Sequence, residues 1–202
     1  MDNWTIRDYM PEDEQQWLFP WERVVTTSHA WFYVVQRKPV RREGSVELVV
    51  EAEGQIVGFM DIEIEDAPGE FCYRQDQLGG FVWEFGVLKE YRRRGIGTAL
   101  LRHGAERAAP RGATHLEFWS MDPGAWEFYR QAGMLELERH YAFFVKPSPK
   151  CVDVYKKHKI YPVRMLAHCS EEAFSSVRRR DDLILSSPFE PHLCIGFDYA
   201  LT

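Results

Sequence analysis

Several features are missing from this sequence, and each absence excludes a class of protein. The four cysteines, Cys72, Cys151, Cys169 and Cys194, stand far apart and form no CxxC pair. Reduced thiols are therefore expected, in place of a metal knuckle or a disulfide framework. The seven histidines form no metal-binding pattern either. We therefore expect no bound metal and a cytoplasmic location.

Long apolar runs and an excess of basic charge are also missing. No apolar stretch approaches the roughly 20 residues of a membrane-spanning helix, and residues 1–4 do not begin a signal peptide. The formal net charge is −6, whereas binding to nucleic acids or anionic membranes depends on a basic surface. The partners are therefore expected to include neither a nucleic acid nor a membrane.

The residues that are present are typical of a folded α/β (α+β) protein, since 45% are hydrophobic and 28% charged. Alternation of apolar and polar residues predicts strands, whereas proline and acidic residues in a first turn predict helix starts. The predicted strands are residues 5–9, 46–51, 56–64, 81–87, 115–119 and 135–145, and the predicted helices begin near residues 11–14, 95 and 122. This order predicts a mixed, mostly antiparallel central sheet with helices on both faces. Asp61, Glu63 and Glu65 alternate along one strand, which we interpret as its solvated side.

The loop after the strand that ends at Val87 is the most informative stretch. It has the sequence Arg92-Arg93-Arg94-Gly95-Ile96-Gly97 and opens the next helix. Glycines let a ligand approach the backbone, and the first turn of a helix presents free N–H groups. Such a helix start favours an anion, most naturally a phosphate or pyrophosphate. By itself, the pattern also fits a purely structural strand-to-helix turn.

Residues 87–101 closely resemble the coenzyme-binding motif of the GNAT superfamily of N-acetyltransferases, which has Arg or Gln, two free positions, Gly, one free position, and Gly or Ala. A second stretch, residues 116–134, resembles another motif of that family, namely a strand, an Asn-x-x-Ala helix start, a Tyr and a closing Gly-Phe. Two departures are visible, because Asp122 replaces the Asn and Met134 the Phe. The resemblance covers approximately residues 4–146, which implies a GNAT-like domain of residues 1–146.

This resemblance implies acetyl-CoA as the co-substrate. The backbone of the fourth strand of the family fold would hold the pantetheine arm, and amides at the helix start would hold the pyrophosphate. The departure at Asp122 puts one coenzyme contact in doubt. The implied coenzyme-binding residues are Phe85, Gly86, Val87, Arg92, Arg93, Arg94, Gly95, Ile96, Gly97, Thr98 and Asp122.

The resemblance also suggests the catalytic groups. Tyr129 matches the general acid of the family, which protonates the leaving thiolate. Glu84 and Glu117 are two candidates for the base that deprotonates the acceptor. Glu84 stands between Trp83 and Phe85, and burial among such rings would raise the pKa of its carboxyl. Glu117 matches a position that serves as base in some relatives.

The expected function is transfer of an acetyl group from acetyl-CoA to a primary amine of a small molecule, by direct attack in a ternary complex. A protein or peptide amine, a catalytically silent acyl-CoA-binding module and a structural anion-binding scaffold stay open as alternatives. Residues 147–202 form an extension beyond the family domain. Three roles stay open for it: packing beside the sheet, closing the acceptor cleft, or a contact in a homodimer.

Overall fold

The amino-terminal strands form where the sequence alternates between apolar and polar residues. Strand β2 (Val46–Ala52) and strand β3 (Gln55–Ile64) pair as an antiparallel hairpin. Its turn residues, Glu53 and Gly54, both have positive φ angles, of 54° and 76°, as a tight hairpin turn requires. Strand β1 (Trp4–Asp8) pairs antiparallel with β2, and strand β4 (Gly79–Val87) pairs antiparallel with β3.

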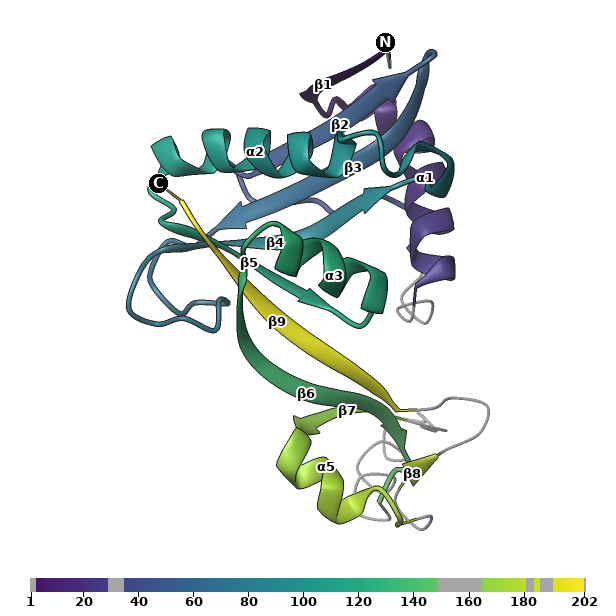
Figure 1. The fold of residues 1–202 in the computed structure, drawn as a ribbon, viewed down its shortest axis with the longest axis vertical. Helices are drawn as coiled ribbons and strands as arrows, with labels where there is room; N and C mark the ends of the chain where they lie inside the picture. The colour runs from purple at the N-terminus through teal and green to yellow at the C-terminus, as the bar shows by residue number, and fades with distance from the viewer. Residues whose placement is uncertain (1–2, 29–34, 149–164, 181–183, 186–190, 202) are drawn as a thin grey trace, which may run out of the picture. The chain divides into compact units, whose positions relative to one another are not determined.

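The computed structural model describes residues 3–28, 35–148, 165–180, 184–185 and 191–201 (Figure 1). The chain divides into two compact units, Met1–Leu137 with Gly196–Thr202, and Glu138–Ile195. The division at residue 146 that the family resemblance implies stays a prediction, and the compact units divide the chain elsewhere. The hydrogen-bonded strand order of the first unit is β1-β2-β3-β4-β5-β9, where β5 is His115–Ser120 and β9 is His192–Ala200, whose last residues, from Gly196 on, belong to this unit. The mixed, mostly antiparallel sheet predicted from the sequence is thereby confirmed.

The helices of the first unit begin where proline, aspartate or glycine stands at the start. The 3-10 turns are η1 (Pro11–Asp13), η2 (Lys89–Tyr91) and η3 (Ala109–Arg111), and the helices are α1 (Glu14–Thr27), α2 (Ile96–Ala108) and α3 (Pro123–Gln131). The predicted helix starts are therefore confirmed. None of the described helices is both long and apolar enough to cross a membrane.

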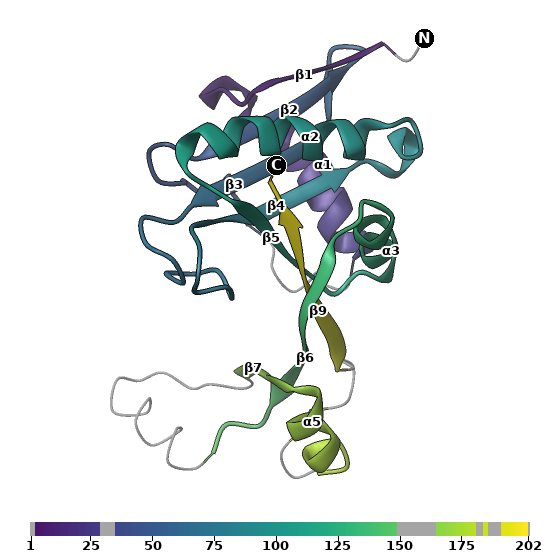
Figure 2. The same cartoon turned by 60° about the vertical axis from the view of Figure 1, so that its left-hand side comes forward.

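Helices α1 and α2 cover opposite faces of the sheet (Figures 1 and 2). On one face, Trp17 and Trp21 of α1 are fully buried, and the Trp17 ring lies 5.4 Å from the Phe59 ring of β3. On the other, Gly104 of α2 packs directly on Met60, the next residue of β3. Successive side chains of a strand point to opposite faces, so the two helices enclose β3 between them.

Strands β4 and β5 separate after a short parallel pairing. Strand β5 (His115–Ser120) pairs with β4 only at Gly79, Gly80 and Phe81 of β4. Beyond Phe81 the two strands diverge toward their carboxyl ends, as Figure 1 shows. The divergence leaves one edge of residues 82–87 without a strand neighbour among the described residues.

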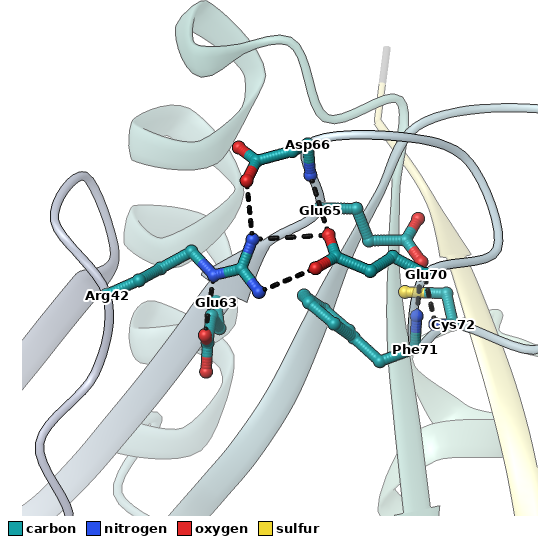
Figure 3. A network of polar contacts seen from close by, with 7 residues as sticks. All are labelled: Arg42, Glu63, Glu65, Asp66, Glu70, Phe71 and Cys72. Carbon is teal, nitrogen blue, oxygen red and sulfur yellow. Dashed lines mark hydrogen bonds and ion pairs between the residues drawn. The ribbon is translucent and has the colours of Figure 1, made fainter.

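The long loop between β3 and β4 is held by carboxylates and one arginine (Figure 3). Arg42 forms ion pairs with Glu63 of β3 at 2.7 Å and with Glu70 of the loop at 2.9 Å. The Glu65 carboxylate accepts the backbone N–H groups of Phe71 and Cys72, at 2.9 and 2.7 Å. These contacts order the loop, because each satisfies polar groups that folding removes from water.

The solvated side expected for Asp61, Glu63 and Glu65 is wrong for two of the three. Asp61 is fully buried and Glu65 is 2% exposed. Lys38 lies 2.7 Å from Asp61, and backbone amides surround Glu65. Buried charges persist when they are paired or hydrogen-bonded, and both conditions are met here by residues distant in the sequence.

The second unit has a small core of its own. It contains most of β6 (Leu135–Val145), strand β7 (Met165–Ser170), helix α5 (Glu171–Val177), strand β8 (Ile184–Leu185) and the first part of β9 (His192–Ala200). Phe143, Phe174 and Ile184 form the core. Ser170 caps α5, because its hydroxyl oxygen accepts the Ala173 N–H at 3.2 Å.

Candidate active site

A cavity of about 130 Å³ opens where β4 and β5 diverge. Its walls come from the end of α1, from the two diverging strands and from the first turns of α3. The lining residues are Val24, Val25, Ser28, Phe59, Val82, Trp83, Glu84, Phe85, Phe118, Trp119, Ser120, Asp122, Ala125 and Tyr129. Two predicted catalytic residues, Glu84 and Tyr129, are therefore brought to one cavity from different elements.

Glu84 presents a buried carboxylate to this cavity. Its side chain is 11% exposed, and the indole N–H of Trp21 donates to its Oε2 at 2.8 Å. Burial raises the pKa of Glu84 to about 7, because the ionised form loses its hydration. Burial is the largest effect on this pKa. The Trp21 hydrogen bond lowers the pKa and the nearby Asp61 raises it, each by less than burial does. A carboxyl with a pKa near neutrality is suited to accept and release a proton.

Buried charges lie directly behind Glu84. Asp61 is opposite Glu84 in the β3–β4 register, and burial raises the pKa of Asp61. Arg41 reaches both carboxylates, with Nη2 at 3.5 Å from Glu84 Oε1 and Nε at 3.7 Å from Asp61 Oδ2. Lys38 adds a second cation beside Asp61. The two cations offset the two carboxylates, which explains how this charge is retained in a buried site.

Tyr129 lies on the other side of the cavity, on α3. It is 4% exposed, and its ring packs among aromatic rings at 5.1 Å from Phe118, 5.1 Å from Phe197 and 6.3 Å from Phe85. This packing holds the phenol in one orientation, because close-packed rings leave little rotational freedom.

Glu117 faces the loop between β3 and β4. It is fully buried and does not line the cavity. Its carboxylate accepts the Tyr73 N–H at 2.7 Å on Oε2 and the Trp119 indole N–H at 2.6 Å on Oε1. Its hydrogen-bonding capacity therefore serves to hold loop and strand together.

The predicted pyrophosphate loop has the backbone of an anion site. Gly95 is the N-cap of α2, with a φ of 81°, and no side chain caps the helix. The backbone N–H groups of the first turn of α2 are therefore positioned to bind an anion. Arg92 and Arg94 turn back onto the chain, because Arg92 Nε donates to Val87 O and Arg94 Nη2 to Glu90 O, both at 3.0 Å. These two arginine side chains therefore contact backbone carbonyl groups close to them in the sequence.

The predicted pantetheine residues lie on the unpaired part of β4. Phe85, Gly86 and Val87 pair with β3 on one edge, and their other edge faces the divergence from β5. Asp122 takes a structural role as the N-cap of α3, since its Oδ1 accepts the Gly124 N–H at 2.9 Å. Asp122 is also among the residues that line the cavity.

A comparison with protein families decides what this arrangement belongs to. Residues 5–134 match the model of the acetyltransferase (GNAT) family, which is well over half of the chain. The chain belongs to the GNAT acetyltransferase family. It is an N-acetyltransferase that uses acetyl-CoA, as the motif resemblance predicted. No curated protein matches this acetyltransferase in sequence.

Solved structures share the fold of this acetyltransferase at low sequence identity. The ribosomal-protein-S18-alanine N-acetyltransferase from Escherichia coli is 15% identical, with a TM-score of 0.53 over 98% of this chain and 94% of that one. A GNAT-family acetyltransferase from Streptococcus pneumoniae is 13% identical, with a TM-score of 0.55 over 96% and 98%. Ard1 from Thermoplasma volcanium is 13% identical, with a TM-score of 0.53 over 98% of each chain. At such identities the likeness concerns the fold alone.

Sequence reasoning missed part of the GNAT site. The wall from α1 and the residues that set the Glu84 environment, Trp21 and Arg41, carry no motif. The contact between the Trp21 ring and the Glu84 carboxylate depends on how α1 packs against β4.

Proposed function

We propose that this acetyltransferase moves the acetyl group of acetyl-CoA to a primary amine of a small molecule, by direct attack in a ternary complex. The observation that carries the proposal is the cavity between the diverging strands, which joins Glu84 on β4 to Tyr129 on α3. The acetyl thioester would lie there, with the pantetheine along the free edge of residues 82–87 and the pyrophosphate at residues 92–98.

Glu84 is the proposed base. An attacking amine must lose a proton, and a carboxyl with a pKa of about 7 is partly ionised at neutral pH while remaining basic enough to accept that proton. Glu84 lines the cavity and Glu117 does not. The Glu117 carboxylate is also hydrogen-bonded to two backbone amides and one indole, which favours Glu84 of the two candidates.

Tyr129 is the proposed acid. As the carbon–sulfur bond of the tetrahedral intermediate breaks, the coenzyme leaves as a thiolate, which the phenolic O–H would protonate. The aromatic packing of Tyr129 supports this role, since a general acid must be held within hydrogen-bond reach of the leaving atom.

The charge of the cavity supports an amine acceptor. Among the lining residues the charged side chains are those of Glu84 and Asp122, and both are acidic. An acidic wall attracts a protonated amine and repels a carboxylate-bearing acceptor. The small volume of about 130 Å³ favours an acceptor that inserts a slender aminoalkyl group.

The test is a thiol-release assay with acetyl-CoA over a panel of polyamines, aminoglycosides, amino acids and short peptides. Turnover with a small-molecule amine supports the proposal, whereas turnover with peptides alone would replace it. Calorimetric titration with acetyl-CoA accompanies the panel. Tight binding without turnover on any acceptor would instead show a silent acyl-CoA-binding module.

Tyr129→Phe separates the acid role from a packing role. The variant keeps the ring and loses only the hydroxyl, so we expect kcat to fall about 10²-fold or more while the Kd for acetyl-CoA stays within a factor of about two. Equal losses in turnover and in coenzyme affinity would contradict the acid role.

A further inference from the structure

Three buried side chains with metal-binding atoms meet outside the candidate active site. Cys72 lies in the loop between β3 and β4, and His115 and Glu117 lie on β5. One donor atom of each, namely the Cys72 Sγ, a His115 ring nitrogen and a Glu117 carboxylate oxygen, lies within 4.8 Å of the other two. The residues are 5%, 0% and 0% exposed, respectively. None of them lines the cavity at Glu84 and Tyr129.

The fold brings the three together by ordinary means. His115 and Glu117 are two residues apart on a strand, so their side chains share one face. The loop is anchored on both sides of Cys72, because the Cys72 N–H donates to Glu65 at 2.7 Å and the Tyr73 N–H donates to Glu117 at 2.7 Å. Figure 3 shows Cys72 beside Glu65, at the end of the Arg42 network. The thiol is thus held against β5.

A second observation points to a ligand at the same place. The Nε2 atom of His115 is buried and has no hydrogen-bond partner in the described part of the chain. A Cβ on Gly79 would lie 2.6 Å from Cys72 Sγ and 2.8 Å from His115 Nε2. Both atoms therefore point to one spot over the Gly79 backbone, where only glycine leaves room. An unsatisfied buried ring nitrogen is costly and rare, and a bound ion would satisfy it.

We propose that Cys72, His115 and Glu117 bind a zinc ion that fastens the β3–β4 loop to β5. Thiolate, imidazole and carboxylate are zinc ligands, and zinc–ligand bonds of about 2.0–2.3 Å place donor atoms about 3.5 Å apart. Small side-chain rotations reach that spacing from the present separations. Binding converts the Cys72 thiol to a thiolate and releases one proton to solvent.

The surroundings of the three residues fit a dication. The thiolate and the Glu117 carboxylate together carry two negative charges, which zinc neutralises. The Glu117 carboxylate is oriented by the Tyr73 N–H and the Trp119 indole, as carboxylate ligands usually are by outer partners. Cys72 and His115 are far apart in the sequence, which is why their spacing alone predicted no metal.

Metal content tests the proposal on the full chain. The protein is refolded from urea under reducing conditions, with zinc or with a chelator, dialysed against metal-free buffer, and measured by mass spectrometry of the elements. About one zinc per chain is expected after refolding with zinc. Cys72→Ser and His115→Gln should lose it, whereas Cys194→Ser, at a buried cysteine of the second compact unit, should keep it. Equal zinc in Cys72→Ser and in the unmodified chain would refute the site.

Two further measurements need neither Cys72→Ser nor His115→Gln, and they keep the test decisive if those variants do not fold. Refolding with cobalt should produce a near-ultraviolet thiolate-to-cobalt absorption band that the Cys194→Ser variant retains. Zinc at about 100 times its Kd should raise the thermal midpoint by roughly 5–10 °C over the chelated protein. A chain that shows neither the band nor the shift does not contain this zinc site.

Discussion

Replacing Glu84 by glutamine tests both the proposed base and the energetic effect of its burial. Glutamine has nearly the same size as glutamate, and its Oε1 atom can accept the hydrogen bond that Trp21 now donates to Glu84 at 2.8 Å. The variant therefore keeps the fold while losing the ionisable group. We expect kcat/KM to fall by about 10²–10⁴-fold, the range that general base catalysis contributes.

The effect on stability has a sign that follows from the raised pKa. The pKa of Glu84 is about 7 in the folded protein, against an ordinary glutamate pKa of 4.5. Ionisation of Glu84 is therefore less favourable in the folded state than in the unfolded chain. The contribution of Glu84 to the free energy of unfolding is fully present below pH 4.5 and is lost as the pH rises through about 7. At about 1.4 kcal/mol per pKa unit, the whole loss is about 3 kcal/mol. Glu84→Gln escapes this loss.

The assay is urea unfolding of both proteins at about pH 5.5 and about pH 8.5. Over that interval the free energy of unfolding of the unmodified chain should fall by about 2 kcal/mol relative to Glu84→Gln. The kcat/KM of the unmodified chain should rise as the pH passes through about 7, and the kcat/KM of Glu84→Gln should not. Glu127→Gln, at an exposed position of α3, is the control and should change neither property. A Glu84→Gln variant with unaltered turnover and pH profile would refute the base role.

Three further substitutions probe the elements around the site. Trp21→Phe removes the N–H that stabilises ionised Glu84, so the midpoint of the kcat/KM–pH profile should rise by about one pH unit; an unmoved midpoint contradicts the assigned environment. Gly95→Ala forces a φ of 81° on a residue with a Cβ. It should lower the free energy of unfolding by about 1–2 kcal/mol and weaken acetyl-CoA binding in calorimetry. A variant that keeps both its stability and its affinity would contradict the strained cap. Gly86→Ala places a Cβ 2.6 Å from the buried Phe59 ring and should lower the free energy of unfolding by about 1–3 kcal/mol in urea; an unchanged free energy of unfolding would contradict this close packing.

The sequence predicted the elements of the first unit because their causes are local. The β2–β3 hairpin depends on alternating apolar residues and on the Glu53-Gly54 turn, whose backbone angles follow from the turn type. Helix α3 begins where Asp122 and Pro123 predict a cap and a first turn. Each of these features lies within a few residues of its cause, so no knowledge of the packing was required.

The candidate site was predicted only where a motif marks it. The Gly95 loop and Tyr129 belong to contiguous motifs of the family, and the sequence located both. It left Glu84 and Glu117 open as bases, because both alternate with aromatic or apolar neighbours on strands. The structure distinguishes their surroundings, since Glu84 lines the cavity and Glu117 holds the β3–β4 loop. The hydrogen bond from Trp21 that lowers the pKa of Glu84 depends on how α1 packs against β4, which no local pattern shows.

By itself the sequence determined the family and the order of the elements, and it predicted the loop that would bind the coenzyme. The tertiary structure decided which charges are buried. The alternation places Asp61 and Glu63 on one face of β3, and Glu65 follows just after the strand, but alternation does not reveal what covers these side chains. Lys38 covers Asp61 and the β3–β4 loop covers Glu65, and so two carboxylates that resemble a solvated edge are buried. The same packing brings Cys72 to β5, because contacts between distant segments form only when the whole sheet is assembled.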